Sequence, residues 1–174
     1  MPGPMLEPGE LAQVSAGTLE HYEQHAEVFR AATRDHDVSQ NINALLKHIQ
    51  GAAPYTILDF GCGPGRDLKS LTALGHRAIG LEGAAAFAAM ARADSGCEVW
   101  RQDFLKLELP EAYFDGVFAN ASLFHVPGQE LPRVLQQLRA TLRWVHEIFQ
   151  SHCPCAGREL FDGTDHLELA RAAG

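Results

Sequence analysis

The chain has 174 residues, of which 46% are hydrophobic, and it carries a formal net charge of −8. This length and hydrophobicity predict one folded domain rather than a disordered polypeptide. The negative charge argues against a nucleic-acid partner, because clustered Lys and Arg are what bind phosphate backbones.

The N-terminal residues and the cysteines bear on the expected location. The opening stretch MPGPMLEPGE lacks the basic and apolar regions of a secretory signal peptide. No run approaches the roughly 18 apolar residues that a membrane-spanning helix needs. Four cysteines are too few for the disulfide framework of a small secreted protein. We therefore expect a cytoplasmic protein with no membrane partner.

Two helices are predicted ahead of the first strand. Residues 1–16 are expected to form a flexible lead. Apolar residues then recur at helical spacing within residues 19–29 and again within residues 38–49. Asp37, or an Asp just before it, is the candidate to cap the second of these helices.

Beyond these helices, short apolar runs alternate with helical patterns. Such alternation is typical of βαβ units, which build a parallel sheet with right-handed crossovers. The predicted fold class is therefore α/β, with a doubly wound, mostly parallel sheet and N-terminal helices. Strands are expected at residues 55–60, 76–82, 97–103 and 114–124, and helices at residues 65–75, 83–93 and from about residue 129.

A glycine-rich turn follows the first predicted strand. The segment DFGCGPGRD places glycine at positions 61, 63 and 65. Ligands of open parallel sheets bind at the carboxyl ends of the strands, and glycine leaves room for a ligand there. The spacing differs from the G-x-G-x-x-G fingerprint of dinucleotide sites. The turn is either a plain connection or a ligand site that is not built for a pyrophosphate.

Acidic residues end the next two predicted strands. Glu82 ends the second strand, where a carboxylate can accept hydrogen bonds from both ribose hydroxyls. Asp103 ends the third strand and can accept a hydrogen bond from an exocyclic amino group. Either residue alone could be a solvated loop acid. Together with the glycine turn, at one edge of one sheet, they predict a nucleoside site.

Residues 19–142 resemble the class I S-adenosylmethionine-dependent methyltransferases, especially small single-domain ones, which have a Rossmann-like fold. LDFGCGPG resembles the first motif of that family and FDGVFANASLFHV its fourth. The resemblance implies S-adenosyl-L-methionine as cofactor and methyl transfer to a small-molecule acceptor. It implies cofactor contacts from Asp59, Gly61, Cys62, Gly63, Gly65, Glu82, Asp103, Phe104 and Asn120, with Ala121 at the substrate mouth, and with Tyr22 and Arg30 from a lid-like helix.

His125 is the candidate catalytic residue. It follows the fourth predicted strand, close to where an acceptor would enter. The sulfonium already activates the methyl group, so a general base is needed only if the acceptor must lose a proton. The alternative interpretation is that His125 is a partly packed residue at the entry to a helix.

The resemblance breaks after about residue 143. The helix predicted from residue 129 keeps its apolar period to Phe149, with no intervening Gly or Pro beyond residue 133. We therefore predict a helix to about Gln150 in place of the fifth strand of the family, with residues 158–163 able to form only a short strand. The sheet would then be incomplete near its C-terminal part.

This departure sets the expected domain organisation and the alternative functions. A single domain is expected over residues 17–174, with a cofactor-binding core at 55–143 and an atypical segment at 144–174. An exposed sheet edge would offer a route to homo-oligomers. One alternative function is a non-catalytic protein that keeps the fold and lacks a complete acceptor site. The other is a nucleotide-dependent oxidoreductase, against which the glycine spacing counts.

The segment HCPC, residues 152–155, raises the question of a metal site. Zinc sites usually have four ligands, with cysteines in C-x₂₋₄-C spacing. Cys153 and Cys155 are separated by one residue, and no second pair of ligands is well spaced. We expect two free thiols here and no bound metal.

Overall fold

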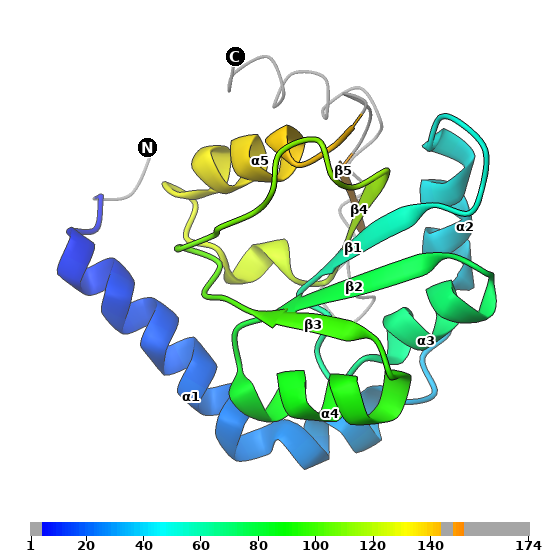
Figure 1. The fold of residues 1–174 in the computed structure, drawn as a ribbon. Helices are drawn as coiled ribbons and strands as arrows, with labels where there is room; N and C mark the ends of the chain where they lie inside the picture. Colours follow the sequence, from blue (N-terminus) through cyan, green and yellow to red (C-terminus); the bar gives the residue numbers. More distant parts are fainter. Residues whose placement is uncertain (1–4, 144–147, 152–174) are drawn as a thin grey trace.

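The computed structural model describes residues 5–143 and 148–151, and its centre is a sheet of five parallel strands (Figure 1). The strand order is β3-β2-β1-β4-β5. The strands are β1 (Thr56–Phe60), β2 (Arg77–Glu82), β3 (Glu98–Arg101), β4 (Gly116–Asn120) and β5 (Ile148–Ser151). The predicted α/β class with a doubly wound parallel sheet is confirmed.

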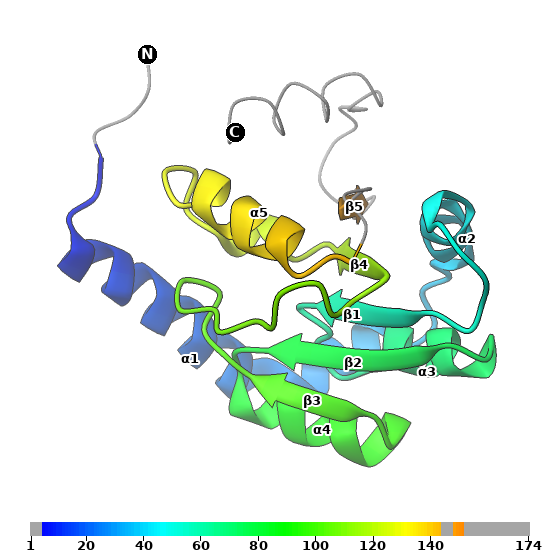
Figure 2. The same cartoon turned by 45° about the horizontal axis from the view of Figure 1, so that its top comes forward.

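Helices cover both faces of this sheet (Figure 2). One face packs against α2 (Ser39–His48), α3 (Arg66–Ala73) and α4 (Ala85–Ser95), and the other against α5 (Leu131–Ala140). The long helix α1 (Pro8–Thr33) runs beside α4, and a short 3₁₀ helix, η1 (Leu123–His125), follows β4. The helices predicted in residues 19–29, 38–49, 65–75 and 83–93 are all present.

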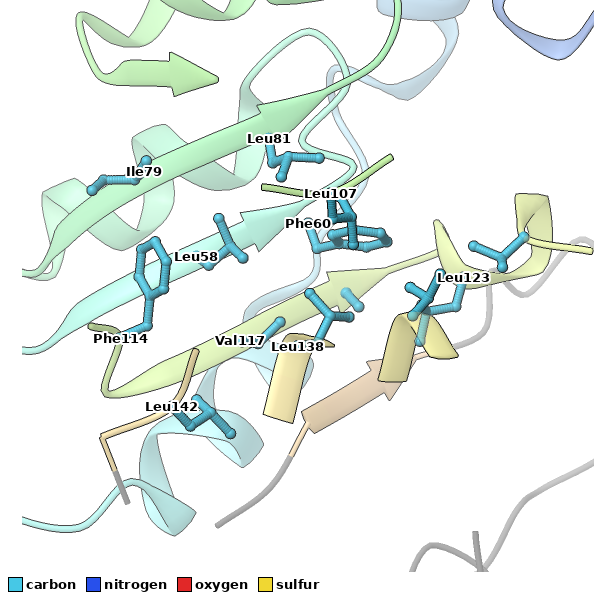
Figure 3. Packing of buried hydrophobic residues seen from close by; sticks show 13 residues of the cluster. Leu58, Phe60, Ile79, Leu81, Leu107, Phe114, Val117, Leu123, Leu138 and Leu142 are labelled. Atoms are coloured by element: carbon cyan, nitrogen blue, oxygen red, sulfur yellow. The ribbon is translucent and has the colours of Figure 1, made fainter. Parts of the chain in front are cut away.

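Alternate residues of the strands build two separate cores. In β1, Ile57 packs with the side chains of α2 and α3, whereas Leu58 faces the core beneath α5. Figure 3 shows the second core, where Leu138 of α5 lies over Val117 of β4. Both faces of the sheet are therefore buried, which explains why the strands are continuous apolar runs.

The strand order reverses between β1 and β4. The chain first proceeds outward from β1 to β2 and β3, and then returns to the other side of β1 to form β4 and β5. Such a reversal opens a crevice at the carboxyl ends of the two central strands, and this is where open α/β sheets bind ligands. The glycine turn after β1 lies at this point.

Helix α1 begins earlier than the sequence predicted. It starts at Pro8, so residues 8–16 are helical and the expected flexible lead over residues 1–16 is wrong for that part. Proline suits the first turn of a helix, because its missing N–H would have no partner there. The Glu10 carboxylate also accepts a hydrogen bond from the backbone N–H of Glu7 at 2.8 Å, as in a capping box.

The predicted extension of the last helix is also wrong. Helix α5 ends at Ala140, and the Thr141 carbonyl accepts hydrogen bonds from the N–H groups of Tyr113 and Phe114 at 2.8 and 2.9 Å. Arg143 then donates its N–H to the Phe114 carbonyl at 2.8 Å. The chain leaves the helix because the segment before β4 offers its backbone groups as partners.

Strand β5 occupies the place that the sequence analysis left empty. It pairs with β4 in parallel, with Phe118 opposite Phe149 and Asn120 opposite Ser151. The open edge of β4 is thus covered. Within the described residues no strand pairs with the outer edge of β5, and that edge replaces β4 as the candidate for association. The predictions for residues 152–155 and 158–163 lie outside the described residues.

No helix in the described parts of the chain has the length and apolarity required to cross a bilayer.

Candidate functional site

A cavity of about 700 Å³ opens at the carboxyl ends of the central strands. Its wall comes from the glycine turn, the end of β2, the segments after β3 and β4, helix α1 and the start of α2. Ten of the predicted site residues line it: Tyr22, Gly61, Cys62, Gly63, Glu82, Asp103, Phe104, Asn120, Ala121 and His125. Asp59, Gly65 and Arg30 do not line it.

Glycine is required at two positions of the turn for different structural reasons. Gly63 has a φ of +51°, and a Cβ built on it would meet no atom within 4 Å. Since Gly63 lines the cavity, that Cβ would occupy space open to a ligand. Gly65 has a φ of +91°, and its Cβ would lie 2.8 Å from the Cα of Ala91 in α4. Gly65 therefore allows α3 and α4 to approach and leaves the ligand space unaffected.

Glu82 connects the end of β2 to the glycine turn. Its Oε2 accepts a hydrogen bond from the N–H of Gly63 at 2.9 Å, and its Oε1 accepts one from the N–H of Ala84 at 3.0 Å. The side chain is buried, and burial raises the pKa of its carboxyl group. The carboxylate is thus fixed in one orientation at the cavity wall, where lone pairs remain for a ligand.

Asp103 and Phe104 form the neighbouring part of the wall, beyond β3. Asp103 Oδ1 accepts hydrogen bonds from the Ser15 hydroxyl of α1 and from the N–H of Leu105, both at 2.9 Å. The Phe104 ring lies against Phe60, with centroids 4.3 Å apart. This corner thus offers an acidic group beside an aromatic ring.

Asp59 lies behind the glycine turn. It is 1% exposed, and its Oδ2 has no hydrogen-bond partner among the described residues. Burial raises the pKa of this carboxyl group well above its ordinary value, and the nearby Asp67 carboxylate adds to the effect. A buried carboxyl oxygen without a partner is uncommon in folded proteins and is typical of functional sites.

A network of polar side chains beside Asn120 was not predicted from the sequence. The Arg66 guanidinium donates to both oxygens of the Asp67 carboxylate, at 2.6 and 3.0 Å, and to the Thr33 carbonyl at 3.0 Å. Asn120 donates its amide N–H to Asp67 at 3.1 Å. Both Arg66 and Asp67 line the cavity. Their signal in the sequence was an adjacent Arg and Asp at the start of a helix that follows a glycine turn.

Tyr22 and His125 meet across the mouth of the cavity. The Tyr22 hydroxyl lies 2.9 Å from His125 Nε2, and the two rings are edge to face with centroids 5.2 Å apart. Burial lowers the pKa of His125 and raises the pKa of Tyr22, so both side chains are uncharged near pH 7. This contact joins α1 to η1 above the strand ends.

Helix α1 is held to α4 by charged groups. The Glu23 carboxylate accepts hydrogen bonds from the N–H groups of Ala85 and Ala86, at the N-terminus of α4. Arg30 forms an ion pair with Asp94 at 3.2 Å. An anion at a helix N-terminus is stabilised by the helix dipole. Arg30 therefore helps to fix α1 from a position outside the cavity, which differs from the expected approach to the cofactor.

The described residues include no group of three or more His, Cys, Asp or Glu side chains arranged to hold a metal ion. Cys62 and Cys97 are free thiols. The HCPC segment lies outside the described residues, so the interpretation of its thiols remains a prediction.

Comparisons with known proteins agree with this geometry. Residues 57–144 match the profile of a methyltransferase domain family. A search of curated protein sequences gives no significant match.

Three solved structures illustrate the likeness of the fold. Phosphoethanolamine N-methyltransferase 1 of Haemonchus contortus, in complex with phosphoethanolamine and S-adenosylhomocysteine, is 15% identical with a TM-score of 0.61, covering 79% of this chain and 31% of that chain. An S-adenosylmethionine-dependent methyltransferase of Mesorhizobium loti is 28% identical with a TM-score of 0.51, covering 59% and 47%. The 1,6-didemethyltoxoflavin-N1-methyltransferase of Burkholderia thailandensis, with 1,6-didemethyltoxoflavin and S-adenosylhomocysteine bound, is 24% identical with a TM-score of 0.60, covering 82% and 62%.

The chain therefore spans less than two thirds of the length of each of these structures. The match over residues 57–144 covers half of the chain and includes the glycine turn, Glu82, Asp103 and His125. The chain belongs to the methyltransferase domain family, whose cofactor is S-adenosylmethionine.

Proposed function

We propose that this chain binds S-adenosylmethionine in the cavity and transfers its methyl group to a small-molecule acceptor. One observation carries the proposal. The turn after β1, Glu82 at the end of β2 and Asp103 beyond β3 line a single cavity, beneath a helix that covers it. These are the three strand ends at which a nucleoside ligand of an open parallel sheet would bind.

The residues present fit this cofactor. A cavity of about 700 Å³ lies within the usual range for small-molecule sites. Gly63 leaves open space where any other residue would place a Cβ. The buried Asp59 Oδ2 has no partner among the described residues and lies behind the cavity wall, so a bridging water can link it to an ammonium group in the cavity.

Each part of the wall then has a role. The turn of Gly61–Gly63 would hold the methionine portion, and Glu82 would accept hydrogen bonds from the ribose hydroxyls. Asp103 and Phe104 would frame the adenine by a hydrogen bond and a ring contact. Four carboxylates in the wall favour S-adenosylmethionine, which carries a sulfonium charge, over its product S-adenosylhomocysteine, which does not. They are Asp37, Asp67, Glu82 and Asp103.

The bound cofactor supplies an activated methyl group on its sulfonium. The protein aligns the acceptor with that methyl and keeps water away, which is a matter of proximity and orientation. Helix α1 serves both needs, because Tyr22 bridges to His125 and Ser15 bridges to Asp103 across the opening.

We propose His125 as the general base for an acceptor that must lose a proton. Its lowered pKa keeps the imidazole neutral, and a neutral imidazole has one nitrogen able to accept a proton. If Nε2 donates its N–H to the Tyr22 oxygen, Nδ1 carries the free lone pair. Tyr22 would then select the tautomer in which Nδ1 is the basic atom.

Isothermal titration of the full chain with S-adenosylmethionine, S-adenosylhomocysteine and NAD tests the proposal. We expect both sulfur ligands to bind at micromolar concentrations and NAD not to bind. Preferential binding of NAD would favour the oxidoreductase. Absence of binding by all three would overturn the proposed function.

A non-catalytic cofactor-binding protein is the second candidate. It would keep the fold and the cofactor cavity and lack a complete acceptor site. Such a protein would bind S-adenosylhomocysteine and transfer no methyl group from labelled S-adenosylmethionine to any member of an acceptor panel. Labelled product from one acceptor would exclude it.

A further inference from the structure

Five aromatic rings form a continuous wall along the cavity. In order they are Phe87 of α4, Phe29 and Tyr22 of α1, and His125 and Phe124 of η1, and all five line the cavity. Successive ring centroids lie 5.2, 5.6, 5.2 and 4.0 Å apart. We call this set the aromatic wall. It extends from the second helix after the glycine turn to the segment that follows β4.

The two ends of the aromatic wall face different parts of the cavity. Phe87 packs with Ala84, two residues beyond Glu82, so its end adjoins the proposed ribose site. Phe124 lies at the other end, beyond β4. It is 63% exposed although it lines the cavity. An exposed phenyl ring at a cavity mouth has an apolar face available to a second molecule.

The charges of the cavity are predominantly negative. Its described lining has four carboxylates: Asp37, Asp67, Glu82 and Asp103. The described lining has no lysine, and its one guanidinium is that of Arg66, which already binds both oxygens of Asp67 and the Thr33 carbonyl. An anionic group in the cavity would therefore lie near carboxylates, with its nearest guanidinium already paired.

Asp37 places one of these charges beside the start of α2. Its Oδ1 accepts a hydrogen bond from the Ser39 N–H at 2.9 Å, and this bond lowers the pKa of Asp37. The carboxylate is thus ionised near pH 7. His36, a further titratable group in this loop, also lines the cavity.

We infer that the methyl acceptor is a flat aromatic compound that is neutral or cationic and carries no phosphate or carboxylate group. The inference rests on the proposed function and adds the class of acceptor. Aromatic side chains stack on flat rings and attract cations to their faces. Like charges in a partly desolvated site repel, and such repulsion excludes wrong ligands.

Three probes with one ring system and different charges test the inference: neutral indole, cationic tryptamine and anionic indole-3-acetate. Their binding to the full chain, saturated with S-adenosylhomocysteine, is measured by ligand-observed NMR at low salt. We expect indole and tryptamine to bind about tenfold or more tightly than indole-3-acetate, a difference of about 1.4 kcal/mol. Phosphoethanolamine, a non-aromatic phosphate ester, is expected not to bind.

Two pairs of variants separate the ring from the charge. Phe124→Ala should weaken the binding of indole and of tryptamine by about fivefold, because a stacking face is lost. It should leave the binding of S-adenosylhomocysteine unchanged. Leu74→Ala, which removes a 54% exposed side chain outside the cavity, is its control. Asp37→Asn should reduce the difference in affinity between tryptamine and indole-3-acetate by about twofold at low salt. Asp35→Asn, in the same loop but outside the cavity, should leave that difference in affinity unchanged.

The possible results distinguish the two proposals. If S-adenosylhomocysteine does not bind, the proposed function fails and this inference fails with it. If it binds and indole-3-acetate or phosphoethanolamine binds as tightly as indole, only the acceptor class is overturned. Absence of binding by all three indoles to the cofactor-loaded protein likewise overturns the aromatic acceptor and leaves the cofactor site intact.

Discussion

The Glu82 carboxylate accepts a hydrogen bond from the backbone N–H of Gly63 at 2.9 Å. This bond joins the end of β2 to the turn that follows β1, two segments that the sequence separates by a whole helix. It fixes the position of the carboxylate at the cavity wall and the path of the glycine turn together. Variants of these two residues therefore test the cofactor site most directly.

Glu82→Gln should weaken S-adenosylmethionine binding by about tenfold, because hydrogen bonds to a charged group contribute about 1.5–3 kcal/mol each and the amide keeps one acceptor oxygen. Titration calorimetry measures the change. Glu98→Gln, at the exposed start of β3, is the control and should bind normally. If the wild-type protein binds the ribo and 2′-deoxy forms of the cofactor equally, the ribose role of Glu82 is wrong.

Gly63→Ala should abolish measurable cofactor binding while the domain stays folded, because the new methyl group projects into the cavity. Gly96→Ala is its matched control. Gly96 also has a positive φ, +69°, and open space at its Cβ, but it lies at the end of α4 outside the cavity. Both variants should lower stability by a similar amount, about 1 kcal/mol, and only Gly63→Ala should lose the cofactor.

Gly65→Ala should act mainly on the stability of the fold, whereas Gly63→Ala acts mainly on cofactor binding. Its Cβ would lie 2.8 Å from the Ala91 backbone, so α3 and α4 would have to move apart. We expect a loss of several degrees in melting temperature, larger than for Gly63→Ala, measured by circular dichroism. Equal melting temperatures for the two variants would show that Gly65 does not set the packing of these helices.

Asp59 predicts a pH dependence of stability. Because the folded-state pKa of Asp59 is raised, its contribution to stability is fully present below about pH 4, the ordinary Asp value, and is lost as pH rises toward the folded-state pKa. Asp59→Asn has no such loss. The melting temperature of Asp59→Asn minus that of the wild type should therefore increase between about pH 4 and pH 7.

The same pH series on Asp35→Asn is the control for Asp59, since Asp35 is exposed and forms an ion pair with its neighbour Arg34. Its difference from the wild type should show no comparable rise. A flat difference for Asp59→Asn would mean that the buried carboxyl group titrates normally.

Tyr22→Phe should change the tautomer of His125 while leaving the ring contacts of the aromatic wall in place. It removes the 2.9 Å hydrogen bond to Nε2, which nitrogen-15 chemical shifts of the imidazole report directly. Tyr55→Phe is the control, since Tyr55 stacks on His76 far from the cavity. Unchanged His125 shifts in Tyr22→Phe would exclude a positioning role for Tyr22.

Local sequence patterns were sufficient to predict the order of the elements through β4 and the positions of the glycine turn, Glu82 and Asp103 at three strand ends. Apolar period and turn residues are local signals, and parallel strands joined by helices must present their carboxyl ends at one edge. Ten of the thirteen predicted site residues consequently line one cavity.

How the helices close over that edge, and where α5 ends, depend on contacts between segments that are distant in the sequence. The apolar run after Arg143 suits a strand as well as a helix, and it forms β5 because the open backbone groups of β4 accept a partner there. The resemblance of its segment to a lid helix predicted that Arg30 approaches the cofactor, but Arg30 pairs with Asp94 of α4 outside the cavity. The contacts of Tyr22 with His125 and of Arg66 with Asp67 and Asn120 depend on side-chain geometry, which no local pattern in the sequence specifies.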